Sequence, residues 1–356
     1  MRTYFTMLLL AMVVTFVMTP IAGRIAALLG AVDLPGPRKI HTEPIARLGG
    51  LAVVAGFCAP LIALYFLDNR VAQIFQQNQM LIIALVGAGI LTFLLGVVDD
   101  VRGLAPRWKL LGQFGVATLM YGGGFRITEF SNPFGGAWQL GWLAFPVTLL
   151  WIVGLTNATN LLDGMDGLAA GVAAVLAVSL SMISILDGNS VLALMTFCLA
   201  GAALGFLPYN FAPARIFLGD CGSLFLGVTM AGISTISLFK AATATLVMVP
   251  MLLFALPLYD TAHVVFHRLS EGRHPFSADK NHVHLRLLRL GLNQREAALF
   301  LYLVTLFLGL AAIILSWRLT SGVFAGLSFS GLLLALSLGL WSWRLRERRG
   351  KQKPPL

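Results

Sequence analysis

Residues 80–100 read MLIIALVGAGILTFLLGVVDD, and this stretch decides the class of fold. Residues 80–98 carry no charge, and they approach the length of about 20 residues that an α-helix needs to cross the hydrocarbon core of a bilayer. The stretch then ends on two adjacent carboxylates, Asp99 and Asp100. It therefore predicts a membrane-spanning helix with ionisable groups at one end.

The rest of the chain has the same apolar character. Of its 356 residues, 58% are hydrophobic and 11% are charged, and the mean hydropathy is +0.85. A soluble domain carries about 25% charged residues, so this chain has too little polar surface to cover a water-soluble globule. Its composition excludes a soluble enzyme, a disordered chain and a nucleic-acid-binding domain, in spite of a net charge of +10. The three cysteines lie in apolar runs and favour neither a disulfide framework nor a zinc site.

Further apolar segments predict about ten more membrane-spanning helices. They lie at 4–29, 46–67, 108–124, 141–157, 166–186, 191–209, 222–239, 241–267, 295–317 and 321–343. The fold class is therefore all-α, a polytopic integral membrane protein of about eleven transmembrane helices. We expect a single transmembrane catalytic domain over 1–343 and a basic cytoplasmic tail over 344–356.

The distribution of charge orients these helices. With eleven spans, 19 of the 25 Lys and Arg residues fall on one side, which the positive-inside rule assigns to the cytoplasm together with the C-terminus. The N-terminus is then outside. Most acidic residues and all six histidines lie at or near the same side, which predicts a polar site facing the cytoplasm. The loops expected to build it are 30–47, 99–109, 157–165, 210–222 and 268–294.

Asp99 and Asp100 form the first candidate cluster, because adjacent carboxylates at the C-terminal end of a helix repel each other and face the negative end of its dipole. Mg²⁺, Lys109 or a basic loop would compensate them. Neighbouring residues on a helix point about 100° apart, so the two carboxylates should have different roles. The alternative is a solvated helix end with charges of both signs.

A second cluster is NATNLLDGMDG, residues 157–167, in which Asn157, Asn160, Asp163 and Asp166 recur at every third position. Neighbouring pairs at this spacing converge on one face of a helix, and their oxygens suit a hard cation such as Mg²⁺. The alternative is helix capping, which would use one or two of the four side chains.

Two further segments complete the candidate site. In FLGDCGS, residues 217–223, glycines flank Asp220 just before a predicted helix, so Asp220 is either a site residue or an N-cap. The long loop 268–294 gathers Arg, Lys and His residues, including His282 and His284, which fit a diphosphate better than zinc. Positive-inside bias is the alternative there, and it explains the arginines better than the histidines. Together these groups suit phosphoryl transfer from a nucleotide-linked donor to a lipid-borne acceptor.

Five sequence blocks in this order resemble the polyprenyl-phosphate N-acetylhexosamine-1-phosphate transferase family, most of all bacterial UDP-N-acetylglucosamine–undecaprenyl-phosphate transferases. The blocks are VDLPGPRKIHTEPIARLGG (32–50), GVVDD (96–100), NATNLLDGMDGLA (157–169), FLGDCGS (217–223) and PFSADKNHVHLRLL (275–288). The resemblance implies ten or eleven helices in the bacterial inner membrane and a cytoplasmic Mg²⁺ site, with Mn²⁺ as an alternative. It also implies the reaction of UDP-GlcNAc with undecaprenyl phosphate to give undecaprenyl-diphospho-GlcNAc and UMP. That reaction begins a lipid-linked cell-surface glycan, such as O-antigen or teichoic acid. The resemblance further suggests a homodimer.

The resemblance also implies roles for individual residues. It implies that Asp220 is the main Mg²⁺ ligand with Asn160 as the second, and that Phe217 stacks on uracil. The residues implied in catalysis are Asp99, Asp100, Lys109, Asp163 and Asp166. Those implied in substrate binding, besides Phe217, are Asn210, His282, His284 and Arg286. The candidate segments themselves add Arg38, Lys39, His41, Asn157 and Asp279 as candidates for substrate binding.

The chain departs from the family pattern at two positions: Leu285 stands where a third histidine is usual, and Gly103 where some relatives carry a third acid. The donor sugar therefore stays open, with UDP-GalNAc and UDP-MurNAc-pentapeptide as alternatives. A transporter of nucleotide sugars or lipid diphosphates is a further alternative, which predicts charges near mid-span. A scaffold without activity should have lost one of the acids, and all of them are present. Both direct displacement and a covalent aspartyl intermediate are compatible with the sequence.

Overall fold

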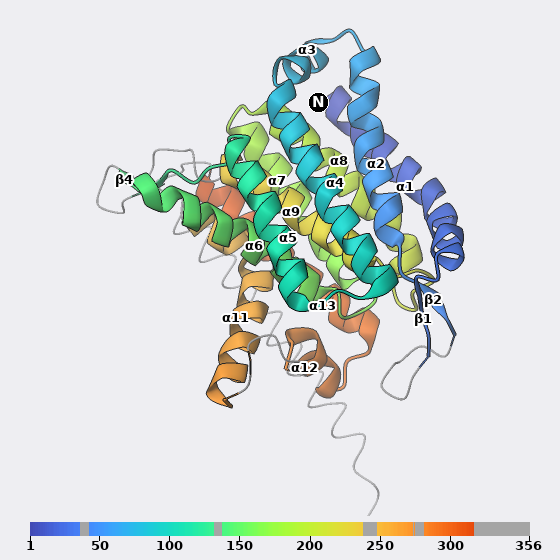
Figure 1. The fold of residues 1–356 in the computed structure, drawn as a ribbon. Helices are drawn as coiled ribbons and strands as arrows, with labels where there is room; N and C mark the ends of the chain where they lie inside the picture. Colours follow the sequence, from blue (N-terminus) through green and yellow to red (C-terminus); the bar gives the residue numbers. More distant parts are fainter. Residues whose placement is uncertain (36–42, 132–136, 238–247, 273, 275–280, 317–356) are drawn as a thin grey trace, which may run out of the picture.

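The computed structural model describes residues 1–35, 43–131, 137–237, 248–272, 274 and 281–316, and this part of the chain is built mainly of α-helices (Figure 1). The long ones are α1 (Arg2–Leu28), α2 (Gly49–Ala63), α4 (Gln79–Arg102), α5 (Pro106–Gly122), α6 (Ala144–Leu162), α7 (Leu168–Leu186), α8 (Ser190–Asn210), α9 (Gly219–Ser237) and α13 (Gln294–Ser316). The predicted all-α membrane fold is confirmed, because eight helical segments among the described residues are long and apolar enough to cross a membrane.

The other three predicted spans have different outcomes. The segment 108–124 forms α5, which is 17 residues long. The segment 241–267 was wrongly predicted as one helix: in its described part, α10 (Met248–Leu253) is separate from α11 (Ala255–Ser270). Pro257 has no N–H to donate to the carbonyl of Leu253, so a continuous helix loses a hydrogen bond there. The span 321–343 and the tail 344–356 lie outside the described residues.

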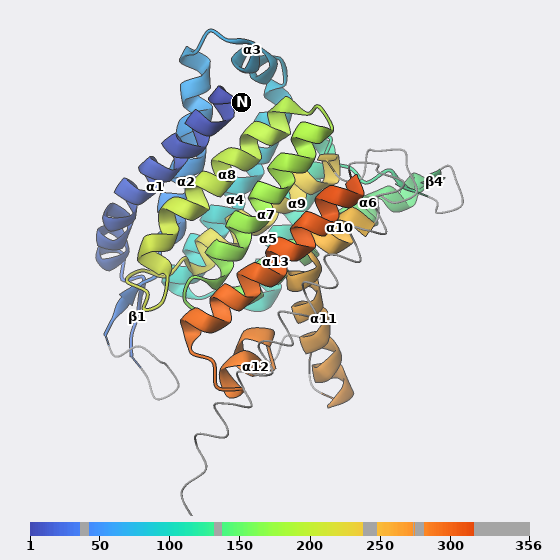
Figure 2. The same ribbon diagram turned by 180° about the vertical axis from the view of Figure 1, so that it is seen from behind.

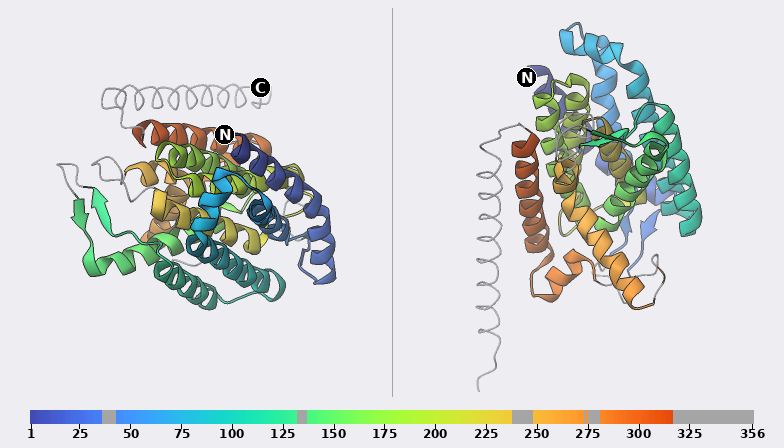
Figure 3. Two further views of the ribbon diagram at one scale, coloured as in Figure 1. Left: turned by 90° about the horizontal axis from the view of Figure 1, so that it is seen from above. Right: turned by 90° about the vertical axis from the view of Figure 1, so that its left-hand side faces the viewer.

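Helix α9 lies at the centre of the bundle and 94% of its apolar stretch is buried. Helices α4, α6 and α2 pack on one side of it, while α7 and α8 lie behind it with α13 and α1 as the outermost layer (Figures 2 and 3). Small residues allow the helices around α9 to approach closely. Gly227 on α9, for example, lies against the backbone of Thr156 on α6. Such close approach is how membrane helices gain packing energy in the absence of a hydrophobic driving force.

Shorter elements lie at the two ends of the bundle. The strands β1 (Val32–Asp33) and β2 (Ile45–Ala46) pair antiparallel, as do β3 (Glu129–Ser131) and β4 (Ala137–Gln139). Helix α3 (Arg70–Gln77) is not among the expected spans, and it begins where the side chain of Asn69 accepts a hydrogen bond from the amide of Ala72. The short helix α12 (Val283–Arg289) lies beside the end of α11, and both extend beyond the bundle (Figure 1).

Three helices run further than predicted, and this shortens the loops that were expected to form the site. Helix α4 continues to Arg102, α6 continues to Leu162 and α9 already begins at Gly219. The predicted loops 99–109, 157–165 and 210–222 are therefore partly helical. Asp99, Asp100, Asn157, Asn160 and Asp220 all project from helix ends, where the backbone fixes their positions more firmly than a loop would.

Candidate active site

The site is built around the first turn of α9, against which the last turns of α4 pack. Gly219 begins α9 with φ +76°, and a side chain there would collide with a neighbouring backbone carbonyl. Gly96 on α4 lies directly against the backbone of Cys221. This close approach brings the Asp100 carboxylate onto the helix start, where it accepts hydrogen bonds from the amides of Asp220 at 3.0 Å and Cys221 at 2.9 Å. Asp100, whose side chain is fully buried, therefore caps α9 and opposes its positive dipole end.

Asp99 points away from Asp100 and meets Lys109, as their 100° separation on the helix predicts. One Asp99 oxygen accepts from the amide of Leu104 at 2.6 Å, and the other lies 2.9 Å from Lys109 Nζ. The same ammonium lies 2.5 Å from an oxygen of Asp220 and 3.3 Å from the amide oxygen of Asn160. These side chains come from four helices, and we call Asp99, Lys109, Asn160 and Asp220 the Lys109 cluster.

Asn160, on α6, links the other members of the cluster through hydrogen bonds. Its Nδ2 donates to Asp220 at 2.6 Å and to the hydroxyl of Ser223 at 2.8 Å, while its Oδ1 faces Lys109. The cluster therefore presents two carboxylates and one amide oxygen to a single cation. Lys109 supplies the compensation that the sequence required for Asp99, and Arg47, 3.7 Å from Asp100, supplies part of it for that carboxylate.

The donor set of the Lys109 cluster fits a hard divalent cation, because carboxylate and amide oxygens are the ligands that Mg²⁺ prefers. Within the described ranges, no group of three His, Cys, Asp or Glu side chains converges on one point. A Mg²⁺ ion held by Asp220 and Asn160 would thus take its remaining ligands from water and substrate phosphates, which is its usual behaviour in nucleotide sites.

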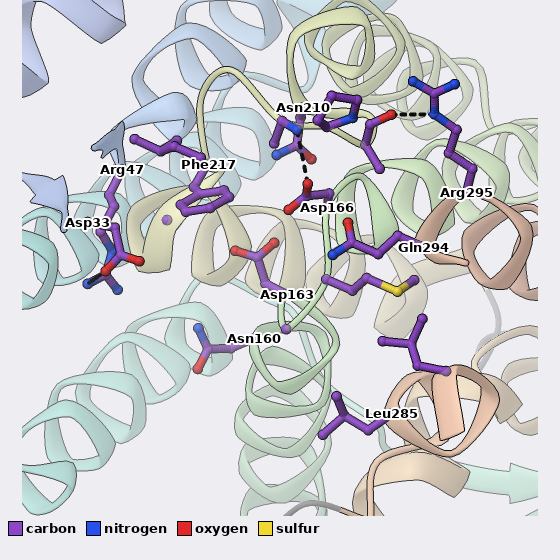
Figure 4. Close-up of a pocket in the computed structure, with 18 of the residues that line it drawn as sticks. Asp33, Arg47, Asn160, Asp163, Asp166, Asn210, Phe217, Leu285, Gln294 and Arg295 are labelled. Atoms are coloured by element: carbon purple, nitrogen blue, oxygen red, sulfur yellow. Dashed lines mark hydrogen bonds and ion pairs between the residues drawn. The ribbon is translucent and has the colours of Figure 1, made fainter. Parts of the chain in front are cut away.

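A cavity of about 820 Å³ opens beside Asp220 and Asn160 (Figure 4). Asp163 lies in it, and burial together with the negative charges of Asp220 and Asp100 raises the pKa of its carboxyl well above the usual value. The other residues lining the cavity are Asp33, Ile45, Arg47, Gly164, Met165, Asp166, Asn210, Ala212, Pro213, Ala214, Phe217, Gly219, Leu285, Leu288, Asn293, Gln294 and Arg295. Six residues predicted from the sequence line one cavity: Asn160, Asp163, Asp166, Asn210, Phe217 and Asp220.

The segment between α8 and α9 forms one wall of the cavity, and its backbone is held from several directions. Asp166 accepts a hydrogen bond from the amide of Ala214 at 2.9 Å. Asn210, only 2% exposed, accepts from the amide of Gly167 and donates to the carbonyl of Ile216. One Nδ2 proton and the oxygen of Asn210 therefore hold this wall in place, and the residue also lines the cavity.

Phe217 is fixed by its backbone on both sides. Its amide donates to the carbonyl of Ala46 at 2.8 Å, and its own carbonyl accepts from the amide of Gly49 at 3.0 Å. The ring lies at the cavity between Arg47 and Asp163 (Figure 4). The start of α2 and the β2 strand therefore place this aromatic ring at the edge of the cavity.

The predicted histidines lie behind the cavity and do not line it. His282, 8% exposed, bonds through Nδ1 to Asp260 at 2.8 Å, and the second oxygen of Asp260 accepts from the amide of Val283. The His284 ring stacks on His282 with centroids 5.5 Å apart and lies against Gly164. Burial lowers the pKa of His284 to about 4, so it is neutral at pH 7.

Other predicted residues also lie away from the cavity. Arg286 is directed to His263, with 3.3 Å between Nη1 and Nε2, and Leu285 is the member of this block that lines the cavity. Asn157 pairs with Gln113 one turn deeper in the bundle. Four residues expected to bind substrate lie outside the described residues: Arg38, Lys39, His41 and Asp279.

Several residues with no role expected from the sequence also lie at the site in the structure. Arg295 donates to the carbonyl of Ala212 at 2.6 Å and reaches the cavity from the start of α13 (Figure 4). Arg47 lies 3.7 Å from Asp33 across β1 and β2. Asp260 could have been found as a lone acid in an otherwise apolar and histidine-bearing helix. Arg295 carried no signal beyond its charge.

These features define a polytopic α-helical membrane protein with a carboxylate–lysine centre beside a cavity at one end of its bundle. The pattern of glycosyl transferase family 4 matches residues 82–238, which include all four residues of the Lys109 cluster. A probable undecaprenyl-phosphate N-acetylglucosaminyl 1-phosphate transferase of Bacillus subtilis (strain 168) is 38% identical over 312 residues, covering 86% of this chain and 83% of that protein. The chain belongs to this family of glycosyl transferases.

Two further relatives extend the comparison. A decaprenyl-phosphate N-acetylglucosaminephosphotransferase of Mycolicibacterium smegmatis is 33% identical, over 83% of this chain and 78% of that protein. An undecaprenyl-phosphate alpha-N-acetylglucosaminyl 1-phosphate transferase of Escherichia coli (strain K12) is 28% identical, over 78% of this chain and 74% of that protein. The resemblance inferred from the five sequence blocks is therefore confirmed.

Proposed function

We propose that this protein transfers N-acetylglucosamine-1-phosphate from UDP-GlcNAc to undecaprenyl phosphate, giving undecaprenyl-diphospho-GlcNAc and UMP. The observation that carries the proposal is the Lys109 cluster, which combines anionic oxygens and an ammonium directly beside a cavity of about 820 Å³. The names of the similar proteins support the same reaction. A polyprenyl phosphate is the acceptor in this proposal and UDP-GlcNAc is the donor.

The cavity suits the donor in size and lining. Small-molecule sites commonly have volumes of about 300–1,000 Å³. Phe217 offers an aromatic face to uracil, while Arg47 and Arg295 place positive charge at the cavity for the diphosphate. Arginine pairs well with phosphate oxygens because its planar guanidinium can donate two parallel hydrogen bonds.

In the proposed reaction, an oxygen of the lipid phosphate attacks the β-phosphorus of the UDP-sugar. A new P–O bond forms while the bond from the β-phosphorus to the bridging oxygen breaks, and UMP leaves with that electron pair. Lys109 sits where it can neutralise phosphate charge beside Asp99. A phosphomonoester has its second pKa near 6, so the acceptor is already largely ionised at pH 7 and Asp99 acts chiefly through position and charge.

Asp220 and Asn160 would hold Mg²⁺ in this proposal, with Mn²⁺ as a substitute. The metal ion would supply charge neutralisation on the donor diphosphate. The carboxylate and amide oxygens that surround Lys109 Nζ support this assignment, since they are hard donors of the type Mg²⁺ selects.

The acceptor would approach from the bilayer. Lys109 lies on α5, and its helix neighbours Trp108 and Leu111 are 56% and 60% exposed, which favours contact with lipid on that side. The uneven distribution of Lys and Arg supports a multi-pass protein of the bacterial cytoplasmic membrane with its site facing the cytoplasm. The product would then begin a lipid-linked cell-surface glycan.

The test is UMP release by the purified protein in detergent, with undecaprenyl phosphate, Mg²⁺ and a panel of UDP-sugars. We expect release from UDP-GlcNAc that requires Mg²⁺ and is lost in Asp220→Ala. Release from UDP-GalNAc or UDP-MurNAc-pentapeptide instead would keep the reaction class and change the donor. Folded wild-type protein that releases UMP from none of them would refute the proposal.

A further inference from the structure

The half of α5 that carries Lys109 is weakly buried. Along residues 106–115, Gln113 is the one buried residue, at 2% exposure, in an otherwise exposed or half-buried stretch. Leu110 and Phe114 pack on the core from this half of the helix. Apolar contact is non-directional, so it holds α5 against the bundle without fixing its rotation or its height.

Gln113, one helical turn after Lys109, makes the directional hydrogen bonds that the apolar contacts of this stretch do not provide. Its Nε2 donates to Oδ1 of Asn157 on α6 at 3.4 Å, and Asn157 Nδ2 donates back to Gln113 Oε1. The second proton of Asn157 Nδ2 goes to the carbonyl of Val153 at 2.8 Å. Both amide protons of Asn157 and its oxygen are thus used within the protein.

This amide pair lies one helical turn from the Lys109 cluster on both helices. Lys109 and Gln113 are spaced i, i+4 on α5, while Asn160 and Asn157 are spaced i, i+3 on α6, so each pair shares a face. Lys109 to Asn160 and Gln113 to Asn157 form two successive polar contacts between α5 and α6.

We propose that Gln113 and Asn157 are a positioning pair that holds Lys109 in the cluster. The inference rests on the proposed transferase function, and it gives Asn157 a role different from the substrate contact predicted from the sequence. A misplacement of about 1 Å at a catalytic group can lower a rate about 100-fold. A single interhelical hydrogen bond contributes little to the stability of a membrane protein, so loss of the pair should affect turnover more than folding.

The experiment measures kcat and KM for UDP-GlcNAc, together with Tm, in purified full-length variants. Gln113→Asn and Asn157→Gln should each lower kcat roughly 10- to 100-fold and leave KM within about twofold. The combined exchange Q113N/N157Q keeps the total length of the two amide side chains and should recover most of the lost kcat. Thr118→Val is the matched control on α5, because the exposed Thr118 bonds only to its own helix at Phe114, and it should change neither constant.

Three outcomes would overturn the inference. The first is an exchange variant Q113N/N157Q with a kcat no higher than that of the slower single variant. The second is a raised KM at unchanged kcat in the single variants, which a substrate contact predicts. The third is a wild-type kcat in the single variants. Q113L/N157L adds a second arm, since replacing both amides leaves no unpaired polar group and should fold with low kcat. Wild-type protein is measured in parallel. If the proposed function is wrong, the wild-type protein itself releases no UMP, so that failure is distinguishable from failure of the positioning role.

Discussion

Asp99 and Asp100 are adjacent in sequence, and the structure gives them different roles that one pair of substitutions can separate. Asp100→Asn removes the charge from a fully buried carboxylate that accepts bonds from the amides of Asp220 and Cys221. Asparagine can accept one of these bonds through its carbonyl. Its NH₂ group would face the second backbone N–H, which then has no acceptor.

The cost of Asp100→Asn follows from these two bonds. A hydrogen bond to a charged acceptor contributes about 1.5–3 kcal/mol and a neutral one about 1 kcal/mol. One hydrogen bond is lost and the acceptor of the other becomes neutral. Together these changes should lower the free energy of unfolding by about 3 kcal/mol. The contact of Arg47 with Asp100 at 3.7 Å adds little, because Arg47 is 39% exposed and water screens the pair.

Asp99→Asn is the matched comparison on the same helix turn. Its remaining carbonyl can still accept from the amide of Leu104, and Lys109 keeps Asp220 as a partner. We expect a loss of less than about 1 kcal/mol in stability and a much larger loss in UMP release. Thermal unfolding in detergent and kcat, measured on both variants, test the reasoning. Equal losses of Tm in the two variants, or a Tm of Asp100→Asn equal to wild type, would refute the capping role of Asp100.

Three further predictions address the cavity and its surroundings. Phe217→Leu should raise KM for UDP-GlcNAc about tenfold at little change in Tm, since stacking of a base on an aromatic ring contributes about 1–3 kcal/mol; an unchanged KM would remove Phe217 from the donor site. Lys109→Met should lower kcat and tighten Mn²⁺ binding in a titration without substrate, because the ammonium no longer occupies the oxygens of Asp99 and Asp220; weaker Mn²⁺ binding would contradict this. The lowered pKa of His284 means that between pH 6.5 and about 4 the unfolded chain binds a proton that the folded chain excludes. Stability from this group is therefore full above about pH 6.5 and falls toward pH 4, by about 3 kcal/mol at most, so Tm should fall less steeply with acid in His284→Asn than in wild type. Parallel pH profiles of the two proteins would count against the buried neutral imidazole.

The positions of the predicted histidines illustrate the limit of motif reasoning. The basic block around His282 and His284 predicted a phosphate-binding loop, and charge alone supported that interpretation. In the fold, Asp260 on α11 accepts hydrogen bonds from the ring of His282 and from the amide of Val283. The two histidines are therefore buried, while Arg286 stays exposed. Asp260 and His282 are 22 residues apart, and no local pattern indicates that they meet.

The sequence by itself determined the membrane class, most helix positions and the helix ends at which polar residues gather. It could do so because each spanning helix must be apolar over its own length, which is a local requirement that a single stretch such as residues 80–98 satisfies or fails. The same local reasoning separated Asp99 from Asp100 by their angle on the helix.

Only the tertiary structure decided which polar groups meet. Lys109 and Asp220 lie 111 residues apart, and their contact depends on how α5 and α9 pack against α4 and α6. Whether an amide such as Asn157 faces a substrate or Gln113 depends on helix rotation, which neighbouring helices set together. A buried side chain takes the partner that packing places within about 3 Å, and packing joins residues without regard to their distance along the chain.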